Sequence, residues 1–186
     1  WRFDEAAGPS ADSSGNGNSA AWTNAAASNL VTAAGPPGIG FTNPNCIDFN
    51  GTSAYVNNGT FSWPTGGPIT IAFWSFALSA AQNSVAFTVG NQDQPNRCQA
   101  HAPWSDGNIY WDYGTAVTGN GRVSTSYAGK LDKWTHVVLV SAGTGGTFQG
   151  IYLDGALANS VATSSGPTVA LTGVRIGHGN AGGFHK

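Results

Sequence analysis

Residues 101–114 read HAPWSDGNIYWDYG, and this stretch decides the predicted fold. It begins with a Pro-Trp turn, passes through an Asp-Gly turn and ends in a strand rich in aromatic and acidic residues. Successive side chains of a strand point to opposite faces, so Tyr110 and Asp112 share one face while Trp111 and Tyr113 share the other. This alternation allows one face to pack inside the protein while the other lines a binding groove.

Short runs of similar character alternate with Gly, Pro and Asn turns along most of the chain, which is typical of a sandwich or a barrel. The dipeptide Asp154-Gly155 predicts a two-residue hairpin between two of these runs. Trp1-Arg2-Phe3 is interpreted as the end of a strand, whereas the Ala-rich segment 20–34 allows a helical turn but has no apolar stripe. The other predicted strands are Cys46–Phe49, Ala54–Val56, Ile69–Leu78, Val85–Val89, Ile109–Tyr113, Trp134–Ala142, Gln149–Leu153, Leu157–Ala162 and Val169–Ile176.

The composition excludes several classes of protein. Seven Trp, nine Phe and five Tyr supply the apolar surface that disordered chains lack. A net charge of −2 gives no basic stripe for nucleic acid, and no run approaches the roughly eighteen apolar residues of a membrane span. The chain of 186 residues shows no repeat or linker, so we expect a single domain over residues 1–186. It contains no Met, and we expect an excerpt or a processed form.

The two cysteines, Cys46 and Cys98, are too few to form a zinc site by themselves. Because only 9% of residues are charged and Gly is abundant, the composition favours an extracellular protein, and we expect a disulfide between them. Closing a loop of about fifty residues would stabilise the fold by roughly 4 kcal/mol. The alternative is a pair of unpaired buried thiols.

The order of these elements resembles the laminin-G-like, concanavalin A-like jelly-roll domains of secreted and surface proteins, in their bacterial form. The resemblance implies a fold of two stacked antiparallel sheets, and a function in binding glycans or protein ligands, in some members with calcium. The pieces that carry it are Trp1–Glu5, Asp12–Asn18, Asp48–Val56, Ile69–Trp74, Pro103–Gly114, Trp134–Val137, Ile151–Gly155 and Arg175–Gly177.

The resemblance also suggests that the first residues and the final strand of such a jelly roll are absent from this sequence. An unpaired sheet edge exposes N–H and C=O groups that recruit another strand. We therefore expect the gap beside Trp1–Phe3 to be filled by a strand that follows Lys186 or by a strand of another subunit.

The candidate ligand-binding residues lie in and beside the 101–114 stretch. Aromatic rings offer a platform for sugar rings, and two carboxylates lie near them. The alternative interpretation is that two of the aromatic residues belong to the core and that Asp106 only caps backbone amides of its turn. The candidates are Trp104, Asp106, Trp111, Asp112 and Tyr113.

A second candidate is the loop from Asp12 to Asn18. Its oxygen-bearing side chains, with Asp12, Asn16 and Asn18 as candidate ligands, suit a hard cation such as calcium. The alternative is a bare Asx-turn loop, which the same residues favour for backbone reasons.

No catalytic signature accompanies these candidates. Glycoside hydrolysis needs two carboxylates that flank the bond, but Glu5 is the single glutamate. His136, within an apolar strand, is interpreted as a hydrogen-bonded core or sheet-face histidine. We therefore expect no enzyme but an extracellular recognition or adhesion module that binds a glycan or a surface protein, without nucleic acid or membrane insertion. The alternative is a structural domain that assembles with neighbouring subunits in a surface filament or a virion appendage, and glycoside hydrolysis is a distant third.

Overall fold

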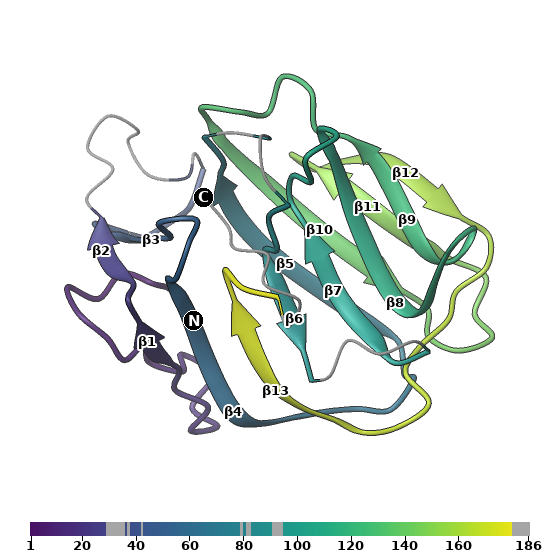
Figure 1. The fold of residues 1–186 in the computed structure, drawn as a ribbon, viewed down its shortest axis with the longest axis horizontal. Helices are drawn as coiled ribbons and strands as arrows, with labels where there is room; N and C mark the ends of the chain where they lie inside the picture. The colour runs from purple at the N-terminus through teal and green to yellow at the C-terminus, as the bar shows by residue number, and fades with distance from the viewer. Residues whose placement is uncertain are drawn as a thin grey trace.

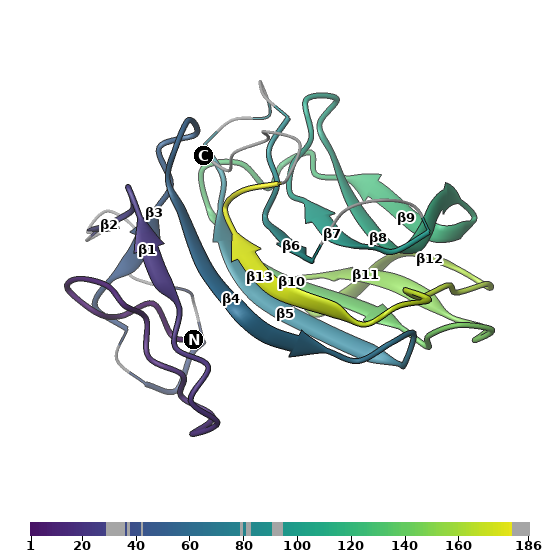
Figure 2. The same ribbon diagram turned by 60° about the horizontal axis from the view of Figure 1, so that its bottom comes forward.

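The computed structural model describes residues 1–28, 36, 38–41, 43–78, 80, 83–90 and 95–179, and within these ranges it contains strands but no helix. Two antiparallel sheets stack as separate layers, which Figure 2 shows most clearly. This confirms the predicted all-β, two-sheet antiparallel jelly-roll sandwich. The described residues contain no helix that is long and apolar enough to cross a membrane.

The larger sheet has seven strands and the smaller has four, and a separate two-stranded sheet lies at the N-terminal side (Figure 1). The order in the larger sheet is β1 (Ala21–Thr23), β4 (Tyr55–Trp63), β13 (Leu171–Ile176), β6 (Phe87–Val89), β7 (Arg97–His101), β8 (Asn108–Thr118) and β9 (Asn120–Ser126). The order in the smaller sheet is β12 (Ala156–Val161), β11 (Gln149–Leu153), β10 (Trp134–Ser141) and β5 (Ile69–Phe76). The separate sheet pairs β2 (Ala26–Ser28) with β3 (Cys46–Asp48).

The core lies between the two layers. From the larger sheet, Trp111 and Tyr113 of β8 are fully buried, and their rings stack at a centroid distance of 5.5 Å. From the smaller sheet, β10 contributes Val137 and Leu139, while β11 contributes Ile151. Burying an aliphatic side chain of this size stabilises the fold by about 1.5–3 kcal/mol, so this double row supplies much of the force that holds the layers together.

Hydrogen bonds also join the layers. The indole nitrogen of Trp111 donates to the Val140 carbonyl at 3.2 Å, and the amide of Gln149 donates to the Trp111 carbonyl at the same distance. The Tyr113 hydroxyl donates to the Gly67 carbonyl at 2.9 Å. The polar atoms of both stacked rings therefore have partners, which buried groups need in order to avoid a desolvation penalty.

Most predicted strands are present, and four strands, β1, β2, β7 and β9, were not predicted. Asp154 and Gly155 both have positive φ, of 51° and 82°, and join β11 to β12 as the predicted two-residue hairpin. The Ala-rich segment contains β1 and β2 in place of a helical turn. Strands β7 and β9 were missed because each has few large apolar residues.

The prediction of a strand at Trp1–Phe3 is wrong. Strand β1 pairs with β4 at that end of the larger sheet, whereas Trp1 has no strand conformation. The Trp1 ring instead packs beside Phe61 at 6.1 Å, and its indole nitrogen donates to the Asn18 carbonyl at 2.7 Å. The first residues are thus held by side-chain contacts rather than by a ladder, so they present no strand edge beside which the expected gap could form.

The predicted disulfide is also wrong, because Cys46 and Cys98 are not bonded to each other. Cys98 lies on β7, opposite Tyr113, and is fully buried in the core, whereas Cys46 lies on β3 in the separate small sheet. Burial raises the pKa of the Cys98 thiol well above its ordinary value. Cys98 therefore behaves as a small apolar core residue.

Two glycines with similar backbone angles give a test of the packing. Gly114 has φ +85°, and a Cβ there would lie 2.1 Å from Ser165 Oγ and 2.6 Å from the Gly166 nitrogen. Gly155 has φ +82°, but a Cβ there meets nothing within 4 Å. We expect Gly155→Ala to cost about 1–2 kcal/mol of unfolding free energy from the backbone alone.

Gly114→Ala should cost this amount and about 1–3 kcal/mol more, because the segment at Ser165 must move. Urea unfolding of both variants measures the difference. Equal losses would show that the segment 165–166 does not pack against β8 as described.

Candidate functional site

The candidate site is a polar cluster on the face of β7, β8 and β9 that points away from the core. Opposite the buried Trp111 and Tyr113, the strand register places Gln99 beside Asp112, and Asp112 beside Arg122. His101 lies opposite Tyr110 in the same ladder. Three neighbouring strands therefore bring their polar side chains together on one surface of the larger sheet. These strands, β7, β8 and β9, form one end of that sheet (Figure 1).

Asp112 is the centre of this cluster, and its side chain is fully buried. Arg122 donates to it through two nitrogens, from Nε to Oδ1 at 2.5 Å and from Nη2 to Oδ2 at 2.6 Å. The Gln99 amide donates to Oδ2 at 2.8 Å, and Arg97 Nη1 lies 3.7 Å from the same oxygen. A buried carboxylate is stable only when it is paired in this way, so these partners are required by its position.

The hydrogen bond to Asp112 raises the pKa of Arg122, which therefore remains charged. In the part of the chain that the structure describes, Arg122 Nη1 has no hydrogen-bond partner. The Arg122 guanidinium also lies over the Tyr110 ring, 5.2 Å from its centroid. The result is a fixed, planar donor whose side chain is 25% exposed.

His101 closes one end of the cluster in its neutral form. Its Nδ1 lies 2.9 Å from the Ser84 carbonyl, and its Nε2 lies 3.1 Å from the Gln99 amide nitrogen. A carbonyl can only accept and an amide nitrogen can only donate, so the proton is on Nδ1. Burial lowers the pKa of His101, in agreement with a neutral ring, and the edge of Trp104 packs on it at 4.3 Å.

Asp106 and Tyr110 form the exposed rim of the site. The Tyr110 hydroxyl donates to Asp106 Oδ2 at 2.6 Å, and the backbone nitrogen of Asn108 donates to Oδ1 at 3.0 Å. The hydrogen bond from Tyr110 is the main cause of the lowered pKa of Asp106, and it raises the pKa of Tyr110. The expected capping of the turn by Asp106 is confirmed, and its carboxylate is exposed to solvent as well.

The five predicted ligand-binding residues therefore divide into two groups. Trp104 is half-buried and Asp106 is exposed, so both offer surface to a ligand. Trp111, Asp112 and Tyr113 are fully buried and present no surface, because both faces of β8 are covered at that point. The prediction that these three residues contact a ligand is therefore corrected. The two rings belong to the core, and the Asp112 carboxylate orients Arg122.

Four residues of the cluster were not predicted: Arg97, Gln99, His101 and Arg122. They lie on β7 and β9, two of the strands that were not predicted. The sequence pattern that indicates a strand at β7 is the alternation of small apolar residues with polar ones. Of these, Cys98 and Ala100 are buried on the core side. His136 lies on the outer face of the smaller sheet, where it packs against Trp74 at 4.8 Å, which agrees with the sheet-face interpretation.

The loop from Asp12 to Asn18 forms an Asx-turn network. Asp12 Oδ1 accepts from the backbone nitrogen and the hydroxyl of Ser14, at 2.8 and 2.6 Å, and Oδ2 accepts from the Asn18 nitrogen at 2.9 Å. These hydrogen bonds, that of the Ser14 hydroxyl above all, lower the pKa of Asp12 from 3.8 to about 2. In the described ranges no group of three or more His, Cys, Asp or Glu side chains could hold a metal ion. Calcium binding by Asp12, Asn16 and Asn18 stays a prediction.

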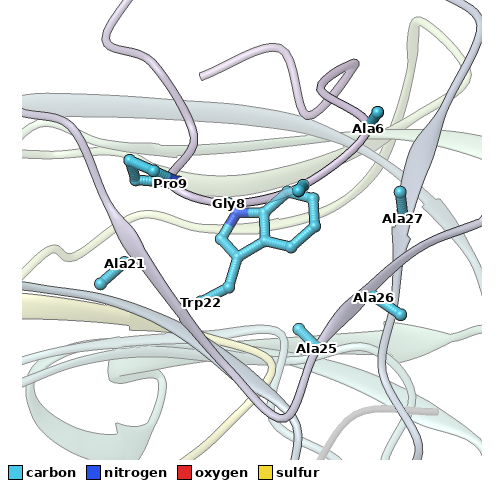
Figure 3. A pocket seen from close by; sticks show the side chains of 9 residues that line it. Ala6, Gly8, Pro9, Ala21, Trp22, Ala25, Ala26 and Ala27 are labelled. Carbon is cyan, nitrogen blue, oxygen red and sulfur yellow. The ribbon is translucent and has the colours of Figure 1, made fainter.

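The N-terminal segment borders a pocket of about 640 Å³ (Figure 3). Trp22 forms its wall and packs against Gly8, where a Cβ would lie 2.6 Å from the indole. The Trp22 nitrogen is turned toward Ser10 Oγ, to which it donates at 2.7 Å. The remaining lining is mostly alanine, so this pocket lacks the polar groups that orient a specific ligand.

Comparison with known proteins identifies relatives of the fold. A family described as the concanavalin A-like lectin/glucanases superfamily matches residues 50–185. Comparison with curated proteins gives no match.

Two solved structures resemble the chain. Domains LG4-5 of the mouse laminin α1 chain align with a TM-score of 0.48 and 14% identity, over 66% of this chain and 31% of that chain. The carbohydrate binding module CBM66 from Bacillus subtilis aligns with a TM-score of 0.41 and 12% identity, over 66% of this chain and 73% of that chain. The aligned region thus spans less than a third of the laminin structure.

The buried ion pair predicts an asymmetry between its two partners. Asp112 cannot reach water, whereas the Arg122 side chain is 25% exposed and can turn outward. We expect Arg122→Gln to cost about 3–5 kcal/mol of unfolding free energy, because a buried charge loses its main partner. Asp112→Asn should cost only about 1–3 kcal/mol. Chemical denaturation measures both, and a larger loss in Asp112→Asn would contradict this arrangement.

The lowered pKa of Asp12 predicts a pH-dependent contribution to stability. Since the folded-state pKa is about 2 against 3.8, the stabilisation is present above pH 3.8 and is lost as the pH falls through about 2. We expect Asp12→Ala to lower the melting temperature at pH 6 and to have little effect near pH 2. Carboxyl NMR titration checks the pKa, and melting with calcium against a chelator separates a cation site from a bare turn.

Proposed function

Because the chain belongs to the concanavalin A-like lectin/glucanases superfamily, we propose that it is a non-catalytic module that binds carbohydrate at the face of β7–β9. The observation that carries this proposal is the Arg122 guanidinium, held on two atoms by the fully buried Asp112 beside the Tyr110 ring. A fixed planar donor next to an aromatic ring suits a sugar, which presents hydroxyl groups at its edge and C–H groups on its face.

Each exposed residue of the site has a role in this proposal. Arg122 Nη1 donates to a sugar hydroxyl, and the exposed Asp106 carboxylate accepts from one, since each of its oxygens has more than one lone pair. Trp104 and Tyr110 supply apolar ring surface. Asp112 acts behind them as a positioning residue, because the site needs Arg122 in one orientation before the ligand arrives.

The same contacts support binding without catalysis. A glycosidase needs one carboxylate as a general acid and a second as a base or nucleophile. Both oxygens of Asp112 already accept charged or amide donors within the protein, and Asp112 has no exposed surface. Asp106, with a lowered pKa, is a poor proton donor at neutral pH. Neither carboxylate suits the role of general acid.

We further propose that the domain acts outside the cell as a recognition or adhesion module. The sparse charge of the sequence and its surface of small polar residues support this location. Its partners are then a glycan or a glycosylated surface protein.

A glycan array tests the proposal. We expect the protein to bind a defined set of glycans, and Trp104→Ala and Asp106→Asn each to weaken binding about tenfold, which corresponds to about 1.4 kcal/mol. Ser105→Ala, at an exposed position between them, is the matched control and should bind like the wild type.

Array hits that neither substitution weakens would place recognition elsewhere on the molecule. Ordered self-assembly without any glycan hit would favour the structural alternative, a domain of a surface filament or virion appendage. Size-exclusion chromatography of the free protein distinguishes these two results.

A further inference from the structure

His101 joins the interior of the polar cluster to the turn that carries Trp104. On one side, its Nε2 lies 3.1 Å from the Gln99 amide nitrogen, which also donates to Asp112 Oδ2 at 2.8 Å. On the other side, its Nδ1 donates to the Ser84 carbonyl at 2.9 Å. His101, Gln99, Asp112 and Ser84 are all buried, so water does not compete for these hydrogen bonds.

Ser84 carries the connection on to the rim of the site. Its hydroxyl donates to the Pro103 carbonyl, so Ser84 accepts from His101 and donates to the residue before Trp104. The Trp104 and His101 rings also pack edge to face, with their centroids 4.3 Å apart. The ring that offers surface to a ligand is therefore held by the same histidine that contacts the interior of the cluster.

These hydrogen bonds fit only one protonation state of His101. The Gln99 amide nitrogen donates one hydrogen to Asp112 and the other to His101, so His101 Nε2 must present a lone pair. A proton on Nε2 would place two N–H groups face to face. Gln99 can offer His101 its oxygen only by turning its amide over, which would set that oxygen against the Asp112 carboxylate. Protonation therefore breaks the Gln99–Asp112 hydrogen bond, or it drives the ring away from Ser84.

Burial and the neighbouring charges decide when His101 takes up a proton. Burial above all lowers the pKa of the ring below its ordinary value of 6.5. The hydrogen bond to Ser84 and the charge of Asp112 oppose this shift, whereas Arg122 and Arg97 add to it. The ring is therefore neutral at neutral pH and becomes protonated only in acid.

The other groups that pack against His101 do not compensate a charge on it. Tyr110, whose ring centroid lies 6.3 Å from that of His101, has its hydroxyl bonded to Asp106. The described residues of segment 83–86 and of β6 include no ionisable side chain. A protonated His101 would thus add a third cation to the two arginines that already lie on the buried Asp112 carboxylate.

We propose that His101 is a pH switch built into the polar cluster. The neutral ring fixes Gln99 against Asp112 and the Ser84 segment against the Trp104 turn, and a proton on Nε2 releases one of these two contacts. The consequence for ligands rests on the function proposed above: the module holds a glycan at neutral pH and releases it in mild acid.

NMR of the side chains tests the switch without any ligand. We expect His101 to be the Nδ1–H tautomer at about pH 7.5 and to become protonated as the pH falls to about 5. The Gln99 side-chain amide and the Asp112 carboxyl carbon should shift with the same midpoint as the His101 ring. A histidine that only fills space would titrate without moving the Asp112 signal.

Matched variants separate the switch from general effects of acid. His101→Gln keeps an acceptor for Gln99 but does not titrate, so the shift at Asp112 should disappear. His178→Gln, whose ring lies against Tyr55 instead, should keep that shift. Gln99→Met removes the donor that faces Nε2, so the pKa of His101 should rise toward 6.5 in this variant, which provides a second test where His101→Gln does not fold.

The glycan array, run at about pH 7.5 and about pH 5, tests the consequence for binding. The wild type and His178→Gln should bind about tenfold more weakly in acid, whereas the affinity of His101→Gln should change less than about twofold. Asp106 does not confuse this comparison, because its pKa is lowered and it stays ionised at both pH values.

Three NMR results would overturn the switch: an Nε2–H tautomer of His101, a ring that stays neutral down to about pH 5, or a protonated ring with no matched change at Gln99 and Asp112. Glycan hits with equal affinity at both pH values would overturn its consequence for binding. An array without hits would contradict the proposed function alone, since the NMR titration decides the switch by itself.

Discussion

The fully buried carboxylate of Asp112 is the constraint on which the site depends. It lies in the middle of β8, a strand that is covered on both faces, so its charge cannot reach water. Arg122 from β9 and Gln99 from β7 must therefore reach it from both sides, and this requirement fixes the register of three strands. On the opposite face of the same strand, Trp111 and Tyr113 are held in the core. Any shift of β8 by one residue would place the carboxylate in the core and a ring among the arginines.

The two outer surfaces of the sandwich differ in chemistry although they share one core. The larger sheet presents ion pairs, a neutral histidine and an exposed carboxylate, whereas the smaller sheet presents mainly rings and aliphatic side chains, with the Asp154–Lys130 ion pair beside His136. Polar groups discriminate between ligands, because a buried donor that loses its partner is costly. Ring surfaces tolerate many ligands of similar shape. In the proposal that the domain binds carbohydrate, recognition of a particular sugar therefore belongs to the polar cluster.

The sequence predicts the fold class well because large side chains alternate clearly between the two faces along β5, β8 and β10. It predicts two faces for β8 but not which face is the core, since both are covered, and so Trp111 and Tyr113 were placed in a binding platform. Arg97, Gln99 and Arg122 were missed because β7 and β9 contain only small or polar residues apart from Val123. The cysteine pairing failed for another reason: composition favours a disulfide, but only three-dimensional positions show that Cys98 points into the core while Cys46 lies in a separate sheet.

Burial of Asp112 also bears on the selectivity of the proposed binding site. The guanidinium of Arg122 loses little conformational freedom when a ligand arrives, because two hydrogen bonds and the Tyr110 ring already fix it. Asp106 is fixed in the same way by Tyr110 and Asn108. An exposed arginine without such partners would lose side-chain conformational entropy on binding. This loss costs about 0.5–1.5 kcal/mol for each immobilised side chain. The entropic cost of ordering these groups arises when the protein folds, and burial of the large aromatic core offsets it. Binding of a ligand then does not include this cost.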